Sequence, residues 1–405
     1  MKKILLFIIL ISIGVTIFYF YKTKEFYKFL NSLEKETIEI NDYYIYGTHL
    51  NIEGTLTDDL IDKDVKLLLK SNKNELEYEI NIDDLSFNLS ELKNEGINLE
   101  NIPEGKYYLL LSYQDDEEPV YYGLKDTTKY HNTYYSISDK KITIDKDKYM
   151  FINVKNEKTP DDIYDIVIDP GHGGSDPGAS NDNYNESDLT LEYSKLLKSK
   201  LEKYGYKVKL TRDNDERLVT YGKGSRTAIS YETKAKYLFS IHFNSNEYYV
   251  SNAGFEIYVP TLCNLNLAQK IRDDITSNLD ISYSNNNSFK VEQGIYLRNL
   301  SYTDIENMRN EAIEKGYEPY EVKENTPYLY MIRETGGSIM NALIDGRDTS
   351  KDKNPYYNSN QASESYLLEL GYINNKSNLY YIVDHKNEYT NVLAKSIHEY
   401  IKKDS

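Results

Sequence analysis

The chain contains few of the residues that build several common sites. Its single cysteine, Cys263, excludes an intramolecular disulfide and a cysteine-rich metal cluster. No G-x-G-x-x-G or Walker sequence indicates a nucleotide-binding loop, and no His-Glu-x-x-His sequence indicates that class of zinc protease. Basic residues are outnumbered, at 48 Lys and Arg against 65 Asp and Glu. The resulting net charge of -17 argues against nucleic acid as a partner.

The composition is nevertheless that of a folded protein. Of the 405 residues, 40% are hydrophobic and 28% are charged, which allows a packed core. At roughly 100–200 residues per domain, this length predicts two or three units. No internal repeat divides the chain.

The N-terminal segment has the pattern of a membrane anchor. Residues 4–21 are uncharged and mostly apolar, and this length approaches the roughly 20 residues that span a bilayer. The run ends in aromatic residues, whereas a cleavage site needs small ones, and it contains no lipobox cysteine. We therefore predict a cytoplasmic tip and an uncleaved, single-pass transmembrane helix over residues 1–24, with the rest of the chain extracytoplasmic.

The next part of the chain predicts a stalk and then strands. Residues 25–39 are charged and predict a stalk, which could be helical. Short apolar or alternating runs separated by turn signals then indicate an all-β, sandwich-like domain at residues 40–155, with a strand pattern like that of immunoglobulin domains. The predicted strands are residues 43–46, 65–69, 76–80, 107–113, 134–137 and 148–154. No catalytic cluster lies among them, so a spacer or binding role is expected, and residues 156–164 form the linker.

From residue 165 onward, strands and helices alternate. This alternation predicts a three-layer α/β/α domain with a mostly parallel sheet over residues 165–405. The predicted strands are residues 166–168, 207–211, 237–241, 255–259, 328–332 and 366–370, and the predicted helices are residues 189–204 and 388–401.

Four titratable residues mark one edge of the predicted sheet. His172 follows the first strand, His242 follows the third, Glu186 precedes the first helix, and Glu369 lies within the last strand. Sites in open α/β sheets form beyond the carboxyl ends of strands, so these groups are expected to converge. Two histidines and one carboxylate are the ligands of a catalytic zinc with an open position. Glu369, flanked by leucines, fits the role of general acid and base, because burying it without a purpose is costly.

Each of these residues also has a simpler interpretation. His172 could be a turn histidine in a glycine-rich loop, and His242 a strand-end histidine with a satisfied hydrogen bond. Glu369 could form a buried ion pair with an arginine such as Arg333. Glu192 is an alternative to Glu186, although it would sit deeper in the helix.

Several motifs follow one another in order across residues 165–401. They are Ile-Val-Ile-Asp-Pro-Gly-His-Gly-Gly at 166–174, Asp-Pro-Gly-Ala at 176–179, Glu186 with Leu189, Lys-Leu-Thr-Arg-Asp at 209–213, Arg226, Leu-Phe-Ser-Ile-His-Phe-Asn at 238–244, Gly-Phe-Glu at 254–256 and Leu-Glu-Leu-Gly-Tyr-Ile-Asn-Asn at 368–375. Together they resemble the zinc-dependent N-acetylmuramoyl-L-alanine amidases of the amidase 3 type. The resemblance covers more than half of the chain and leaves the β-domain outside.

The resemblance implies an activity and roles for individual residues. His172, Glu186 and His242 would bind one Zn²⁺, and Glu369 would act as acid and base. The substrate would be bacterial peptidoglycan, cut between the muramoyl sugar and the L-alanine of the stem peptide on the wall side of the cell membrane. Asn244 and Arg333 are candidate substrate contacts. Two rivals stay open: a zinc peptidase acting on the stem peptide, and a non-catalytic, peptidoglycan-binding regulatory module.

One insertion departs from the length of a minimal amidase. Residues 303–317, between Gly254 and Glu369, form an acidic, helix-like run. One hypothesis is that Glu306, Glu311 or Glu314 reaches the zinc and inhibits the enzyme; the alternative is a helix that packs at the rim of the cleft. A protein activator could bind this insertion or the β-domain.

Overall fold

The computed structural model describes residues 20–33, 37–218, 226–245, 253–297 and 361–404, apart from residues 117, 129, 131, 182, 261, 288 and 289, together with single positions between 303 and 314. Arg333, the strand predicted at residues 328–332, most of the predicted inhibitory run and residues 4–19 of the predicted anchor lie outside these ranges. Among the described residues, no helix is long and apolar enough to cross a membrane.

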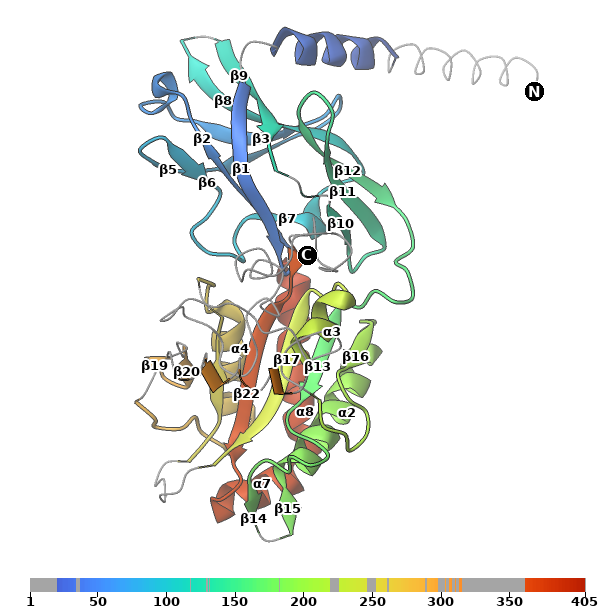
Figure 1. Cartoon of the computed structure of the whole chain (residues 1–405), viewed down its shortest axis with the longest axis vertical. Coiled ribbons are helices and arrows are strands. Elements are labelled where there is room, and N and C mark those ends of the chain that lie inside the picture. The colour runs from blue at the N-terminus through green and yellow to red at the C-terminus, as the bar shows by residue number, and fades with distance from the viewer. Residues whose placement is uncertain are drawn as a thin grey trace, which may run out of the picture.

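The first half of the chain folds around an apolar core lined by strands (Figure 1). The strands are β1 (Thr37–Tyr46), β2 (His49–Thr55), β3 (Lys66–Lys70), β4 (Glu75–Glu79), β5 (Asn81–Asp83), β6 (Ser86–Asn88), β7 (Ile97–Asn98), β8 (Gly105–Asp115), β9 (Glu118–Asp126), β10 (Asn132–Tyr135), β11 (Lys140–Lys146) and β12 (Met150–Asn156). Their main order is β10-β11-β12-β8-β9-β1-β2-β6-β5, and β3 branches from β8 and pairs with β4. All belong to one hydrogen-bonded network, and a kinship with the immunoglobulin fold stays a prediction.

A helix over residues 20–32, which overlaps the first part of the predicted stalk, packs on this half (Figure 1). Phe26, Phe29, Leu30 and Leu33 recur at helical spacing and form an apolar cluster with residues of β8 such as Leu110. Successive residues of β8 point to opposite faces of the sheet, so one face fills the main core and the other receives this helix. The chain then enters β1 at Thr37.

The second half is an α/β domain, as predicted. Its sheet has the order β16-β13-β17-β22-β18-β20-β19, with four parallel and two antiparallel pairs. The strands are β13 (Ile166–Pro170), β16 (Val208–Leu210), β17 (Tyr237–Asn244), β18 (Glu256–Tyr258), β19 (Lys290–Glu292), β20 (Ile295–Tyr296) and β22 (Glu364–Tyr372), beside the small hairpin of β14 (Ser180–Asn181) and β15 (Tyr184–Asn185). The helices are α2 (Glu186–Lys203), α3 (Arg226–Glu232), α4 (Asn266–Asn278), α7 (Lys376–Asp384) and α8 (Lys386–Asp404).

Helices cover both faces of this sheet. Leu189, Tyr193, Leu197 and Leu201 of α2 bury one helical stripe in a core shared with α4, α7 and α8. On the opposite face, Ile229 of α3 packs against a smaller cluster around Val167, Leu238 and Leu367. The domain therefore has three layers.

The two halves share hydrogen-bonded backbone. Strand β21 (Gln361–Ala362) pairs in parallel with Ile45 and Tyr46 of β1, and two residues later the chain begins β22 of the second sheet. Asn94 of the first half donates to the Glu364 carboxylate at 2.9 Å, and both side chains are buried. The predicted linker is bound as well, because Lys207 Nζ donates to the carbonyl of Pro160 at 2.7 Å.

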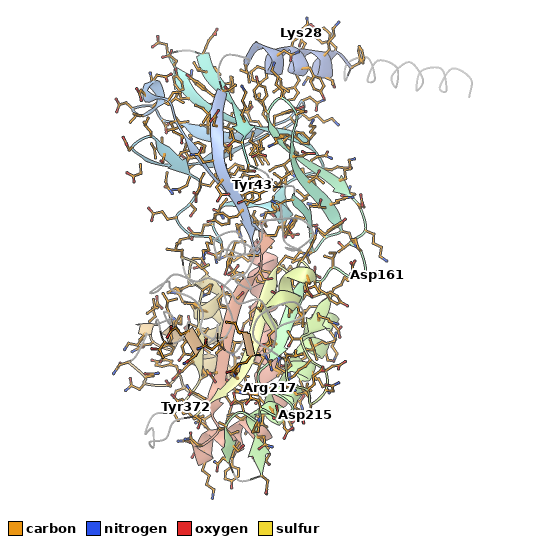
Figure 2. The ribbon with its side chains drawn as sticks, in the orientation of Figure 1. Lys28, Tyr43, Asp161, Asp215, Arg217 and Tyr372 are labelled. Carbon is orange, nitrogen blue, oxygen red and sulfur yellow. The ribbon has the colours of Figure 1, made fainter. Side chains whose placement is uncertain are left out.

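The direction of β22 decides which end of the molecule carries the site. The strand begins at the contact with the first half and runs away from it, in parallel with β13 and β17 (Figure 1). The carboxyl ends of these strands therefore lie at the far end of the second half. Figure 2 shows Tyr372, Asp215 and Arg217 in this part of the molecule, and Lys28 of the N-terminal helix at the opposite end.

Candidate metal centre

His172 lies in a tight loop just after β13. Its backbone has a φ of 58°, in the left-handed region that is uncommon for a residue other than glycine. Gly171, directly before it, packs against the second histidine: a Cβ there would meet the ring of His242 at 2.4 Å. Glycine at this position therefore lets the two imidazoles approach, with ring centroids 4.9 Å apart.

Glu186 is the first residue of α2 and points into the same space. The positive end of the helix dipole favours a carboxylate at this position. The backbone N–H of Phe243 donates to Oε1 at 3.0 Å, and that of Ala179 donates to Oε2 at 3.0 Å. With an exposed fraction of only 4%, the side chain is fixed between the loop and strand β17.

The three predicted ligands come together. Glu186 Oε1 lies 3.1 Å from His172 Nε2 and 3.0 Å from His242 Nδ1, and one donor atom from each residue lies within 4.8 Å of the others. Two donors bound to one tetrahedral zinc would be about 3.3 Å apart, given metal–ligand distances of about 2.0–2.1 Å. The donor types and their spacing therefore fit such an ion.

The neighbouring charges favour the ionised forms of His172 and Glu186. Burial by itself would lower the pKa of His172, but the carboxylates of Glu186 and Asp176 outweigh it and raise that pKa. Burial would raise the pKa of Glu186, but hydrogen bonds from His172 and His242 lower it well below its usual range. Asp176 Oδ2 lies 3.1 Å from His172 Nδ1, although the two groups are not aligned for a hydrogen bond.

Glu369 lies beside this cluster in β22. It is the partner of His242 in the parallel pairing with β17. Burial, followed by the charges of Glu186 and Glu256, raises its pKa well above the usual range. Its buried Oε2 has no hydrogen-bond partner among the described residues. A carboxyl group with a free oxygen and a strong tendency to hold a proton is suited to proton transfer.

The sequence of the second half matches a known protein family. The sequence profile of the amidase 3 family, described as N-acetylmuramoyl-L-alanine amidase, matches residues 166–403. The chain belongs to this amidase family. The match begins at β13 and ends within α8, so the β-domain lies outside it.

Individual relatives of the amidase domain match over shorter stretches. A sporulation-specific N-acetylmuramoyl-L-alanine amidase of Bacillus subtilis is 38% identical over 96 residues, which are 23% of this chain and 35% of the relative. A probable cell wall amidase of Staphylococcus aureus is 53% identical over 62 residues, 15% of this chain and 21% of the relative. The chain thus spans about a third or less of these relatives.

Solved amidase structures were also found. The catalytic domain of an N-acetylmuramoyl-L-alanine amidase from Bacillus (Paenibacillus) polymyxa is 19% identical, with a TM-score of 0.39, and the match covers 59% of this chain and 99% of that domain. An N-acetylmuramoyl-L-alanine amidase from Nostoc punctiforme is 22% identical, with a TM-score of 0.37, and the match covers 60% of this chain and 98% of that one.

The structure also places the remaining predicted residues of the amidase domain. Asn244 ends β17, two residues after His242, and is partly exposed; its substrate role stays a prediction. Glu192, the alternative to Glu186, lies away from the cluster and pairs with Lys386 Nζ at 2.6 Å. Arg333 lies outside the described residues.

Three residues around the candidate metal site received no role in the sequence analysis. Glu256 is fully buried opposite Glu369, and Asp169 and Arg212 are buried below the His172 loop. All three lie within motifs quoted above, so a signal was present. Motifs alone do not reveal that these side chains are buried or which groups they contact.

Proposed function

We propose that this protein is a zinc-dependent N-acetylmuramoyl-L-alanine amidase that cuts the bond between the muramoyl sugar and L-alanine in peptidoglycan. The observation that carries the proposal is the convergence of His172, Glu186 and His242 beside the carboxyl group of Glu369. Membership of the amidase family supports it. The rival zinc peptidase would use the same ligands, so the products separate the two reactions.

In the proposed hydrolysis, the metal and the side chains of the protein have separate roles. A zinc ion held by the three ligands would activate a bound water and polarise the lactyl carbonyl. Glu369 would take a proton at its carboxylate from the attacking water and deliver it to the departing L-alanine nitrogen. Glu186 is kept in place by the N–H groups of Phe243 and Ala179, so its carboxylate needs little rearrangement on binding the metal.

We also propose that residues 4–21 anchor the protein in the cell membrane, with the amidase domain on the wall side. The apolar run precedes a helix that packs at the end of the molecule opposite the candidate site (Figure 2). In this arrangement the β-domain would separate the membrane from the catalytic edge, and that edge would face the wall.

The test uses the full-length protein in detergent with purified peptidoglycan, with added zinc or chelator, beside a Glu369→Ala variant. Release of intact stem peptides by the wild-type protein, abolished by chelator and by the substitution, would establish the amidase. Shortened peptides would establish the peptidase instead. Zinc binding without release would point to inhibition by residues 303–317 or to a missing protein activator. Neither binding nor release would favour the regulatory module.

A further inference from the structure

Two arginines hold three successive carbonyls of the loop that carries His172. Arg226 donates from Nη1 to the Pro170 carbonyl at 2.6 Å and from Nη2 to the carbonyl of His172 itself. Arg212 donates from Nε to the Pro170 carbonyl at 3.0 Å and from Nη2 to that of Gly171 at 2.8 Å. The two guanidinium groups thus fix the backbone immediately before and at the first imidazole.

Arg212 also holds the start of the helix that carries Glu186. Its Nη2 donates to the carbonyl of Ser187 at 2.8 Å and to the hydroxyl of Thr190 at 3.1 Å. That hydroxyl in turn donates to the Gly171 carbonyl at 2.8 Å. One guanidinium group therefore joins a residue next to the first imidazole to a residue next to the carboxylate.

Asp169 connects Arg226 to β17, the strand that carries His242. Its Oδ1 accepts from Arg226 Nη1 at 2.8 Å and from the Thr211 hydroxyl at 2.6 Å, and its Oδ2 accepts from the Ser240 hydroxyl at 2.7 Å. Burial would raise the pKa of Asp169, but Arg226 and the two hydroxyls lower it, so the carboxylate stays charged. Ser240 lies two residues before His242 in β17.

The loop needs such support for physical reasons. The left-handed backbone of His172 is unfavourable, and the three carbonyls point towards a common region. A planar guanidinium group offers five N–H donors in a rigid fork, which a lysine cannot reproduce. Arg212 is only 1% exposed, and burying a charge is costly unless it makes such bonds.

We propose that Arg212 and Arg226 are positioning residues, a clamp that sets the geometry of His172 and Glu186 and thereby the affinity of the site for zinc. This proposal rests on the proposed function, because it takes both residues as metal ligands. Neither arginine contacts the reacting atoms. Their effect acts through the loop and the helix start, so it shows in metal binding as well as in turnover.

The test measures the zinc dissociation constant of the full-length protein by competition with a chromophoric chelator. Arg212→Lys and Arg226→Lys keep the charge and lose the fork, and we expect zinc to bind about 10–100-fold more weakly, as for other groups that orient metal ligands. Arg272→Lys is the matched control, since Arg272 of α4 binds Glu292 and Asp273. Zinc affinity should be unchanged in that variant.

A buried lysine in Arg212→Lys or Arg226→Lys could prevent folding, so Thr190→Val, which removes a hydroxyl bound by Arg212, is tested as well. The substitution removes one hydroxyl, and we expect a smaller loss of zinc affinity in the same direction. Thr390→Val is its control, because Thr390 is a buried helix residue of α8 whose hydroxyl binds the Lys386 carbonyl. Thermal unfolding of the metal-free proteins measures the purely structural effect of each change.

The outcomes separate the clamp from the proposed function. Weaker zinc binding in the clamp variants, beyond any shift seen in the controls, supports the proposal. If the wild-type protein binds zinc and releases stem peptides while the clamp variants bind zinc equally well, the clamp is overturned and the amidase stands. If the wild-type protein binds no zinc, both are overturned.

Discussion

Glu369 and Glu256 lie directly opposite each other across the antiparallel strands β22 and β18. Glu256 is held by the hydroxyls of Tyr258 at 3.0 Å and Tyr372 at 2.8 Å and by that of Ser284. Glu369 Oε2 has no such donor among the described residues. Of two neighbouring carboxyl groups, one is therefore stabilised by hydrogen bonds and the other is kept at a cost in stability.

This contrast predicts that Glu369→Gln removes activity and raises stability. We expect activity to fall by about 10²–10⁴-fold, the usual contribution of a general acid and base. The pKa of Glu369 is raised in the folded protein, so its contribution to stability is present below the unfolded pKa of about 4.5 and is lost as pH rises. At neutral pH the metal-free variant should therefore be more stable, by about 1 kcal/mol or more.

Urea unfolding in the presence of chelator, at pH 4 and at pH 7.5, measures this difference. We expect it at the higher pH and not at the lower. A variant that keeps wild-type turnover would rule out the assigned role of Glu369.

The carboxylate ligand gives a second prediction. Glu186→Ala should abolish tight zinc binding, because the variant loses the oxygen that lies within 3.1 Å of both imidazoles. Equilibrium dialysis followed by metal analysis measures the bound zinc. Glu192→Ala serves as the control and should retain one zinc per chain, since Glu192 pairs with Lys386 away from the site. The reverse result would assign the ligand role to Glu192.

A third prediction concerns the β-domain and pH. Burial, and next the charge of Glu53, raises the pKa of Asp42 from 3.8 to about 6. The stability that Asp42 contributes is thus complete below pH 3.8 and is lost as pH rises through about 6. Asp42→Asn keeps an acceptor for the backbone N–H of Tyr43 and avoids the charge. Because the side chain is partly exposed, we expect a gain of about 1–2 kcal/mol at pH 7.5.

Denaturant unfolding at pH 4 and pH 7.5 tests this expectation. The exposed residue Asp83 of β5 gives the control, and Asp83→Asn should change stability little at either pH. Equal stability of wild-type protein and Asp42→Asn at pH 7.5 would contradict the prediction.

A fourth prediction addresses the contact between the halves. Asn94→Ala removes a buried donor to Glu364 and an acceptor for the backbone N–H of Asn264. Leaving buried polar groups unpaired should cost about 1–3 kcal/mol in the free energy of unfolding. Urea unfolding measures the loss, and limited proteolysis should show earlier cleavage between the halves. Asn81→Ala, at an exposed asparagine pair, is the control; an equal effect of both changes would argue against a buried bond across the halves.

Local patterns in the sequence predicted much of the second half. Ile166, Val167 and Ile168 form an uninterrupted apolar run, which is typical of a strand covered on both faces. The stripe from Leu189 to Leu201, followed by Gly205, predicted α2 and its end. The proximity of His172 and His242 could be predicted because strand ends in such a sheet meet at one edge, and Glu186 was expected nearby as the residue at the start of the first helix.

Contacts between distant segments could not be predicted in the same way. Gln361 and Ala362 pair with β1, but two residues carry no periodicity that would indicate a partner more than 300 positions away. The packing of the N-terminal helix was overlooked for a different reason. Phe26, Phe29, Leu30 and Leu33 give a helical apolar stripe, and the charged residues between them favoured the interpretation as a stalk.

The strand that joins the halves has a geometric consequence. From β21 to Glu369 the chain is paired almost continuously, first with β1 and then with β17. Such a connection leaves little slack for a hinge between the N-terminal helix and the edge of the sheet that carries the candidate metal site. If the proposed anchor holds the helix at the bilayer, the proposed amidase would act at a fixed distance from the membrane. It would release stem peptides from glycan strands at one depth of the wall and leave the peptides of nearer and more distant strands attached.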